Sequence, residues 1–261
     1  MKKLFLSVSL FFFALVHAQQ EFVYDSLPQP DNPVWEYQSK KNIVKLSLTS
    51  LIFNNFQLQY ERIINKKVGV SLSLSTFLSS NIPQLNSLEV VVDDADTFLA
   101  LKGIRLGYYS ITPEVRFYLG KQGFGKGFYL APFYRHSNFI IEGAVFDFQK
   151  DDGSDTELST KGNLNANTLG LLLGSQFNLS KNLVLDWWIV GPHLGVGSGG
   201  LEGSKATPFT NFEKESLQAT LDSFELPLVE SNTVVEGQKA TIDFSGPWGG
   251  VRAGLSLGYR F

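Results

Sequence analysis

Eight charged residues occupy positions at which alternating segments of this chain otherwise carry small or polar side chains. They are Lys45, Glu61, Glu114, Arg116, Arg135, Asp186, Arg252 and Arg260. Side chains of a strand alternate between two faces, so these charges point away from the face that their apolar neighbours share. Because a buried charge without a partner is costly, we expect a network of ion pairs and hydrogen bonds inside a barrel. A gated path for protons or ions is the alternative interpretation.

Two of the arginines follow a proline at the same spacing, in Pro113-Glu114-Val115-Arg116 and Pro132-Phe133-Tyr134-Arg135. Proline cannot donate to the ladder of a sheet, so both prolines should lie at bulges or strand ends. The matching spacing predicts two inward arginines at similar depth that share one acidic partner, either Glu61 or Asp186.

His136, Ser137 and Glu142 are residue types that serve in nucleophilic catalysis, and lipid A deacylases use such a set. The members of a catalytic triad must lie within hydrogen-bond reach of one another. Adjacent strand residues face opposite sides, so His136 and Ser137 cooperate only if the strand bulges. By parity, His136 points outward near the membrane surface. We therefore expect no catalytic residues, with a lipid A-modifying enzyme as an alternative.

The sequence also argues against a metal or cofactor site. It has no cysteine, and His136 and His193, the latter expected at the outer end of its strand, cannot alone supply a multi-histidine site. The pairs Asp93-Asp94 and Asp151-Asp152 are interpreted as solvated loop charges. With 22 basic and 25 acidic residues the net charge is −3, which excludes the basic footprint of a nucleic-acid-binding protein.

These residues lie on segments that alternate with period two, most clearly in residues 251–261 at the end of the chain. About eleven residues is the length of a tilted strand that crosses a bilayer. Eight such segments are predicted, at about 42–51, 56–63, 68–78, 105–119, 128–141, 165–179, 183–195 and 251–261.

The connections between these segments alternate in length. They are short after the second, fourth and sixth segments and long after the third, fifth and seventh, at about 79–104, 142–164 and 196–246. Outer-membrane barrels have short periplasmic turns and long outer loops, and only a closed barrel leaves no open sheet edge in lipid. We therefore predict an all-β fold, an eight-stranded antiparallel up-and-down transmembrane barrel over 42–261 with a packed polar lumen.

The last long loop contains a helix signal. Thr210 and Glu213 have the spacing of a capping box, and Leu217, Leu221 and Phe224 follow at i, i+4 and i+7. A short amphipathic helix is predicted over about 211–224. Its apolar stripe is expected to cover the barrel mouth, with contact to lipid or to a partner barrel as alternatives.

The N-terminus has the pattern of a secretory signal peptide over 1–18. Lys2 and Lys3 precede the apolar run Leu4 to Val16, and cleavage is predicted between Ala18 and Gln19. Residues 19–41, with three prolines, should form an irregular periplasmic segment.

Motifs spread along nearly the whole mature chain resemble small OmpA/OmpX-like outer-membrane barrels, and in particular a Bacteroidota barrel family of unknown function. They are the strand around Lys45, Tyr60-Glu61-Arg62, Pro113 to Tyr118, Leu185 to Trp188, Gly191-Pro192-His193 and the ending Tyr259 to Phe261. The alternate residues Leu257, Tyr259 and Phe261 also resemble the C-terminal signal by which such barrels are recognised for assembly. The resemblance implies a fold and an outer-membrane location, with both termini periplasmic, but no reaction.

We therefore expect a non-enzymatic outer-membrane protein with a structural, adhesive or accessory role through its outer loops. Its expected partners are outer-membrane lipid and lipopolysaccharide, the barrel-assembly machinery during insertion and another outer-membrane protein. A soluble, exported lipocalin-like carrier is the remaining alternative.

Overall fold

The computed structural model describes residues 40–81, 103–121, 123–222 and 229–261. The chain divides into two units, Met1–Glu36 and Tyr37–Phe261, and all the described residues belong to the second. The predicted signal peptide, its cleavage site between Ala18 and Gln19, most of the segment 19–41, Asp93-Asp94 and Phe224 lie outside the described residues.

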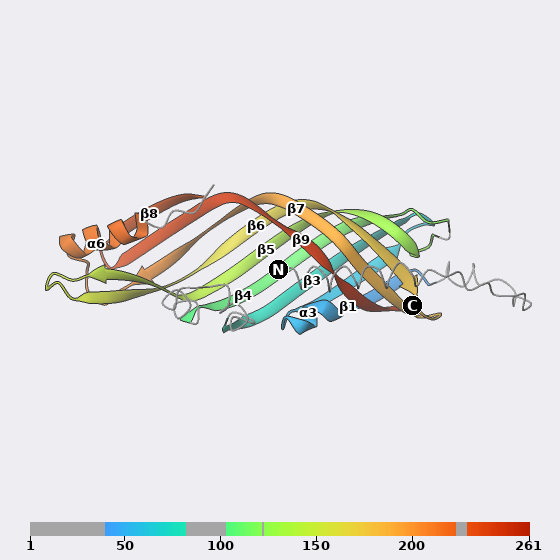
Figure 1. The fold of residues 1–261 in the computed structure, drawn as a ribbon, viewed down its shortest axis with the longest axis horizontal. Helices are drawn as coiled ribbons and strands as arrows, with labels where there is room; N and C mark the ends of the chain where they lie inside the picture. The colour runs from blue at the N-terminus through green and yellow to red at the C-terminus, as the bar shows by residue number, and fades with distance from the viewer. Residues whose placement is uncertain (1–39, 82–102, 122, 223–228) are drawn as a thin grey trace, which may run out of the picture. The chain divides into compact units, whose positions relative to one another are not determined.

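The described residues form one antiparallel sheet whose strands are joined in a ring (Figure 1). Its strands are β1 (Asn42–Ser47), β2 (Phe56–Ile63), β3 (Val68–Asn81), β4 (Arg105–Tyr118), β5 (Gly127–Gln149), β6 (Asp155–Asn178), β7 (Leu183–Ser204), β8 (Glu230–Glu236) and β9 (Lys239–Arg260). Each strand from β1 to β7 pairs with the next, β7 pairs with β9, and β9 pairs with β1. The predicted all-β, antiparallel, closed fold is confirmed.

The ring closes where the first strand, β1, pairs with the last strand, β9. Ile43 pairs with Arg260, and Ser47 pairs with Ser256. The N–H of Asn42 donates to the carbonyl of Phe261 at 3.1 Å, and the N–H of Phe261 donates back at 2.9 Å. We call the end of the barrel at which Asn42 and Phe261 lie the terminal end, and the opposite end, which carries α6, the α6 end.

Burial alternates strictly along the shorter strands, as the sequence pattern predicts. In β2, Gln57, Gln59, Glu61 and Ile63 are buried, while Phe56, Leu58, Tyr60 and Arg62 are exposed. The apolar side chains therefore cover the outside of the ring and most polar ones fill its interior, the reverse of a soluble barrel.

Several predicted strand boundaries are wrong. The first strand ends at Ser47, and helix α3 (Leu48–Ile52) follows it, with the Ser47 side chain accepting from the N–H of Ser50 at its start. An apolar–polar alternation over five residues cannot distinguish the continuation of a strand from a short capped helix.

The long outer loops predicted over 142–164 and 196–246 are instead largely strand. β5, β6, β7 and β9 have 23, 24, 22 and 22 residues, and β8 adds a further strand beside β9. Twenty-four residues span about 80 Å at ~3.3 Å each, far more than a bilayer requires. These outer halves carry Gly, Asn, Ser and Thr, so the alternation that marks a lipid-facing strand is absent from them.

The predicted helix is confirmed as α6 (Asn211–Asp222), which packs at the α6 end against β5 and β8. Its capping box is formed: the N–H of Thr210 donates to Glu213 Oε2 at 2.8 Å, and the N–H of Glu213 donates to Thr210 Oγ1 at 3.2 Å. The hydrogen bond from Lys205 lowers the pKa of the Glu213 carboxyl, so its contribution to stability is present at neutral pH and is lost as acidification protonates it.

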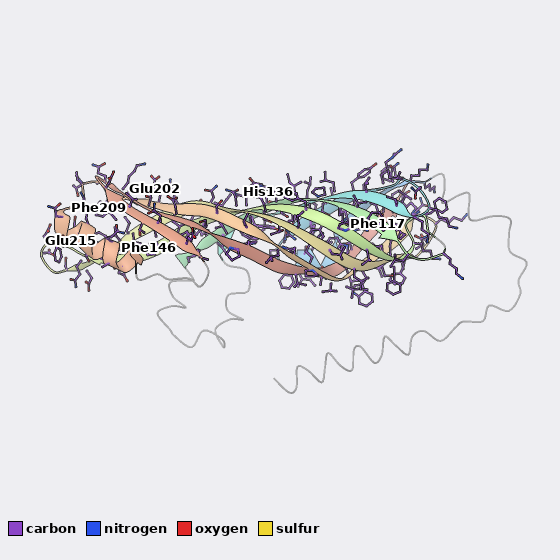
Figure 2. The ribbon with its side chains drawn as sticks, turned by 90° about the horizontal axis from the view of Figure 1, so that it is seen from above. Phe117, His136, Phe146, Glu202, Phe209 and Glu215 are labelled. Atoms are coloured by element: carbon purple, nitrogen blue, oxygen red, sulfur yellow. The ribbon has the colours of Figure 1, made fainter. Side chains whose placement is uncertain are left out.

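The apolar stripe of α6 completes a second hydrophobic core, separate from the barrel interior. Leu217 and Leu221 are buried there with Phe209 from the preceding segment. Strands contribute Phe148, Leu158, Ala240 and Ile242. Figure 2 shows Phe146 and Phe209 close to α6, with Phe117 toward the opposite end of the barrel. The outer sheet of β5, β6, β7, β9 and β8 therefore has its own core.

This core predicts a local effect for Leu217→Ala. Leu217 is fully buried, so its truncation should cost about 2–5 kcal/mol in the outer sheet, measured by hydrogen exchange of β5 and β8 amides. Phe212→Ala, on the exposed side of the same helix, is the control and should change little. Equal effects of the two variants would contradict the second core.

Candidate functional site: the charged lumen

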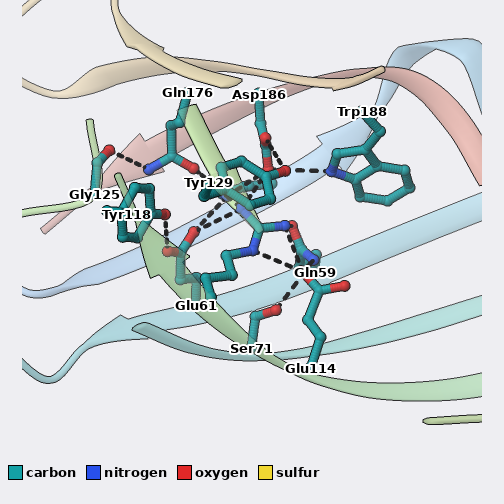
Figure 3. A network of polar contacts seen from close by, with 12 residues as sticks. Gln59, Glu61, Ser71, Glu114, Tyr118, Gly125, Tyr129, Gln176, Asp186 and Trp188 are labelled. Carbon is teal, nitrogen blue, oxygen red and sulfur yellow. Dashed lines mark hydrogen bonds and ion pairs between the residues drawn. The ribbon is translucent and has the colours of Figure 1, made fainter. Parts of the chain in front are cut away.

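The candidate site is a cluster of charged side chains inside the ring, toward the terminal end (Figure 3). Alternation places one or two inward residues from five strands at this level: Lys45 on β1, Glu61 on β2, Glu114 and Arg116 on β4, Asp186 on β7 and Arg252 on β9. We call these six residues the charge network. None is more than 5% exposed.

Lys45 joins the strands on both sides of the closure. Its Nζ lies 2.5 Å from Glu61 Oε2, 2.6 Å from Asp186 Oδ2 and 2.5 Å from Gln176 Oε1 on β6. All three protons of the ammonium group therefore have an acceptor, which a fully buried lysine requires.

Arg116 lies at the centre of the network. Its Nη1 is 2.6 Å from Asp186 Oδ2 and 3.1 Å from Glu61 Oε2, while Nε donates to Glu114 Oε1 at 2.6 Å. Nη2 donates to Gln59 Oε1 at 3.1 Å. The guanidinium thus contacts all three carboxylates.

Aromatic side chains from β4, β5 and β7 complete the coordination of the acids. Tyr129 Oη donates to Asp186 Oδ1 at 2.7 Å, and Trp188 Nε1 donates to Asp186 Oδ2 at 3.2 Å. The Tyr118 hydroxyl donates to Glu61. The Tyr129 ring also lies beneath the Arg116 guanidinium, whose carbon is 4.5 Å from the ring centroid.

Arg252 ends the network on the side toward α6. Its Nη1 is 3.2 Å from Glu114 Oε2. Its guanidinium carbon lies 4.6 Å from the centroid of Phe133 and 4.7 Å from that of Trp188. The six residues therefore contain three bases and three acids, a neutral set that replaces water in the lumen.

Arg260, which the sequence grouped with these residues, lies below the network. Its Nη1 donates to the carbonyl of Phe124 at 2.9 Å, in the turn between β4 and β5. Gln176 Nε2 donates to the carbonyl of Gly125 in the same turn at 2.6 Å. Gly125 has φ +76°, and a Cβ on it would lie 2.7 Å from Ile63, so glycine lets this turn close the lumen.

Arg135 does not share a partner with Arg116, contrary to the prediction from the two Pro-x-x-Arg sequences. It lies closer to the α6 end, where Nε donates to Ser137 Oγ at 3.3 Å and Nη2 to the Tyr108 hydroxyl. Arg252, from a strand without this motif, shares Glu114 with Arg116 instead. Equal spacing within two strands says nothing about the offset between them.

An aromatic layer above the network was missed by the sequence analysis. The ring of Tyr108 lies 5.4 Å from that of Phe77 and 5.0 Å from that of Phe139, and Phe139 lies 5.3 Å from Trp248. These four residues come from four strands, so only the register of the ring brings them together. Their inward parity within strands longer than expected was the one available signal.

His136 and Ser137 point to opposite sides of the wall. Ser137 is buried inside, whereas His136 Nδ1 lies 2.9 Å from Asn167 Oδ1 on the outer face. Glu142 lies beyond them along β5, level with Arg105 and Lys161. The described residues thus do not bring the three into one site.

His193 lies in the middle of β7, which continues to Ser204, and not at the outer end as predicted. The bulge at Trp188–Gly191 turns it inward, where its ring lies 6.0 Å from that of Phe133. In the described part of the chain, no three acidic or histidine residues are grouped to hold a metal ion. Asp151 and Asp152 instead accept hydrogen bonds from Thr210 and Ser154.

Leu257, Tyr259 and Phe261 lie on the outer face of the closing strand and are 39–53% exposed. Neither α3 nor α6, the helices of the described residues, has the length and apolar character needed to cross a membrane.

Comparisons with known proteins add little. No family model and no curated protein matches the sequence. The structure is similar to that of Ail, the attachment invasion locus protein of Yersinia pestis, with a TM-score of 0.29 and 11% identity, over 85% of this chain and 99% of that one. So low a score supports no conclusion about fold or function.

The geometry predicts a large effect for Asp186→Asn. Asp186 accepts from Lys45, Arg116, Tyr129 and Trp188, so the substitution leaves an uncompensated buried positive charge and should cost about 3–5 kcal/mol. The free energy of unfolding is measured with denaturant in detergent, followed by tryptophan fluorescence.

Lys239→Met is the matched control. Lys239 also forms an ion pair, at 2.8 Å to Glu202, but its side chain is 64% exposed and should contribute little. Equal stabilities of the two variants would mean that the network does not hold the strands together.

Proposed function

We propose that this chain is an integral, non-enzymatic outer-membrane protein: an eight-stranded transmembrane barrel with a plugged lumen and both termini in the periplasm. Its outer sheet carries a structural, adhesive or accessory role through contacts beyond the membrane. Lipid, lipopolysaccharide and another outer-membrane protein are the proposed partners, and the barrel-assembly machinery is the proposed partner during insertion.

The outward apolar band of the ring is the observation that carries this proposal. On β6 the outward residues Phe177, Leu171 and Leu169 are 42–69% exposed. Further along the same face, the residues become Asn167, Asn165, Asn163 and Lys161. On β5 the change falls between Tyr134 and His136, which pair with Leu169 and Asn167. The band therefore ends at one level on neighbouring strands.

The height of this band agrees with that of a bilayer. From Leu179 to Leu169, ten residues at ~3.3 Å and a tilt of about 45° give about 23 Å, close to the ~25 Å apolar band of outer-membrane barrels. In water, such an array of exposed Leu, Val, Ile and Phe would be an aggregation surface.

The arrangement of ends supports the proposed orientation. The start of β1 and the end of β9 both lie at the terminal end, where the turns around Asn65, Gly123 and Asn182 are short. The α6 end projects well beyond the band and carries polar residues such as Glu142, Lys161, Glu202 and Asp243 around a shallow groove. We assign external contacts to this end.

A charge placed in the band tests its exposure to lipid. Leu72, 43% exposed at mid-height on β3, faces outward. Leu72→Arg should cost about 2–4 kcal/mol in lipid bilayers, measured by folding at graded denaturant. Asn163→Arg, outward but beyond the band, is the control and should leave stability nearly unchanged. A tolerated Leu72→Arg would contradict contact with lipid.

The neutral network predicts a barrel that does not conduct steadily. Planar-bilayer recordings of the purified protein should show no stable open state, because side chains fill an eight-stranded interior. Steady channels of hundreds of picosiemens would overturn the plugged lumen. A membrane barrel should require detergent for extraction and should change its gel mobility on heating. A soluble carrier would show neither property.

A further inference from the structure

The lumen between the charge network and the aromatic layer contains basic side chains whose donors lack acceptors. Arg252 is 5% exposed, and its Nε and Nη2 have no hydrogen-bond partner among the described residues. Nδ1 of His193 is also buried without a partner there. Buried polar atoms without a hydrogen-bond partner cost free energy, so they indicate a missing partner, and for the two N–H donors of Arg252 that partner is an acceptor.

The charge of this region is not balanced by the protein. Each of the three carboxylates of the network forms ion pairs with two of its bases. Glu61 and Asp186 each pair with Lys45 and Arg116. Glu114 pairs with Arg116 and Arg252. Arg135 lies above them and forms no ion pair with a carboxylate in the described ranges. Its hydrogen-bond partners are the hydroxyls of Ser137 and Tyr108, which leave its positive charge uncompensated.

The three basic residues gather at one level of the lumen, which is open to solvent at Gly250. His193 lies within electrostatic range of both Arg135 and Arg252. Opposite His193, on the same inward face of β9, stands Gly250, which is exposed although it points into the barrel. A Cβ on Gly250 would lie 3.0 Å from His193 Nε2. Phe133 and the aromatic layer form the apolar walls.

The wall beside this level of the lumen is interrupted. On the side of β9 away from β7, the described strands pair with residues 256–260 (β1) and with residues 239–245 (β8). Between them, no described strand pairs with β9 on that side, and the N–H of Leu255 donates to Thr49 Oγ1 of α3 at 3.3 Å. Gly249 and Gly250 lie in this interval, so among the described residues no strand covers the wall beside them.

We propose that this part of the lumen, bounded by Arg135, His193, Arg252 and Gly250, is a binding site for an oxyanion, a phosphate or carboxylate group. Guanidinium groups donate in the fork geometry that these anions accept, and charge-assisted bonds are strong between apolar walls. A cation is excluded by the surplus positive charge. The group belongs either to a soluble molecule or to an anionic lipid that enters beside β9.

Isothermal titration of the full chain with inorganic phosphate, in a nonionic maltoside detergent, tests the site. Saturable binding is expected for the unmodified protein. Arg135→Gln and His193→Gln should each weaken it at least tenfold, since neither residue belongs to the charge network. Gly250→Val, which adds a side chain beside His193 without removing charge, should weaken it to a similar extent.

Lys239→Gln is the control, because it removes one exposed positive charge far from the site and should leave phosphate binding unchanged. Heat-modifiable mobility verifies that each variant is folded. The proposal is overturned if phosphate up to about 10 mM gives no saturable signal, or if Lys239→Gln weakens binding as much as Arg135→Gln.

The same titration in nanodiscs separates the two sources. Loss of phosphate binding in anionic lipid, but not in zwitterionic lipid, identifies a lipid headgroup as the occupant; equal binding in both identifies a soluble anion. The detergent experiment requires only the folded barrel, so its failure would leave the proposed membrane location standing.

Discussion

The pairing of β1 with β9 is the contact on which the remaining structure depends. It joins five residue pairs, from Ile43–Arg260 to Ser47–Ser256, and converts an open sheet into a ring. Without it, Lys45 would lie on a free sheet edge, apart from Asp186 and Gln176. The backbone N–H and C=O groups on the facing edges of β1 and β9 would then have no partners. In hydrocarbon that cost has no remedy, since lipid offers no hydrogen bonds.

Closure of the ring encloses an interior, and the charge network fills part of it with paired charges. A ring of this size leaves an interior that side chains can just fill, and alternation makes those side chains polar. Three bases and three acids, bonded to one another and to neighbouring polar side chains, give an interior with no net charge from these groups. Because the partners come from β1, β2, β4, β7 and β9, the network also opposes slippage of any one strand, which would move every charge to the other face.

The sequence predicted those parts of the structure in which apolar and polar residues alternate regularly. The segment 56–63 was identified as β2 without error, and the parity of Lys45, Glu61 and Asp186 was correct, because apolar residues alternate with polar ones there. Pattern analysis failed where this alternation ends. β6 continues through Asn167, Asn165 and Asn163, whose polar side chains leave no apolar–polar alternation. α3 replaces strand after Ser47 because the Ser47 side chain caps the helix. Contacts between strands, such as Arg252 with Glu114 or Trp248 with Phe139, depend on register and on the bulge near Trp188, neither of which is encoded at one position.

The proposed membrane location accounts for the two cores. In a bilayer, lipid would stabilise the apolar side chains on the outside of the ring, and the interior would be polar. Beyond Leu169 and Tyr134 burial reverses: Phe148, Leu158 and Ile242 pack with Leu217 and Leu221 of α6. The aromatic layer and the basic residues below it lie where one arrangement gives way to the other. The unpartnered Nε and Nη2 of Arg252 lie at this transition. An anion at that level would satisfy donors that neither core can.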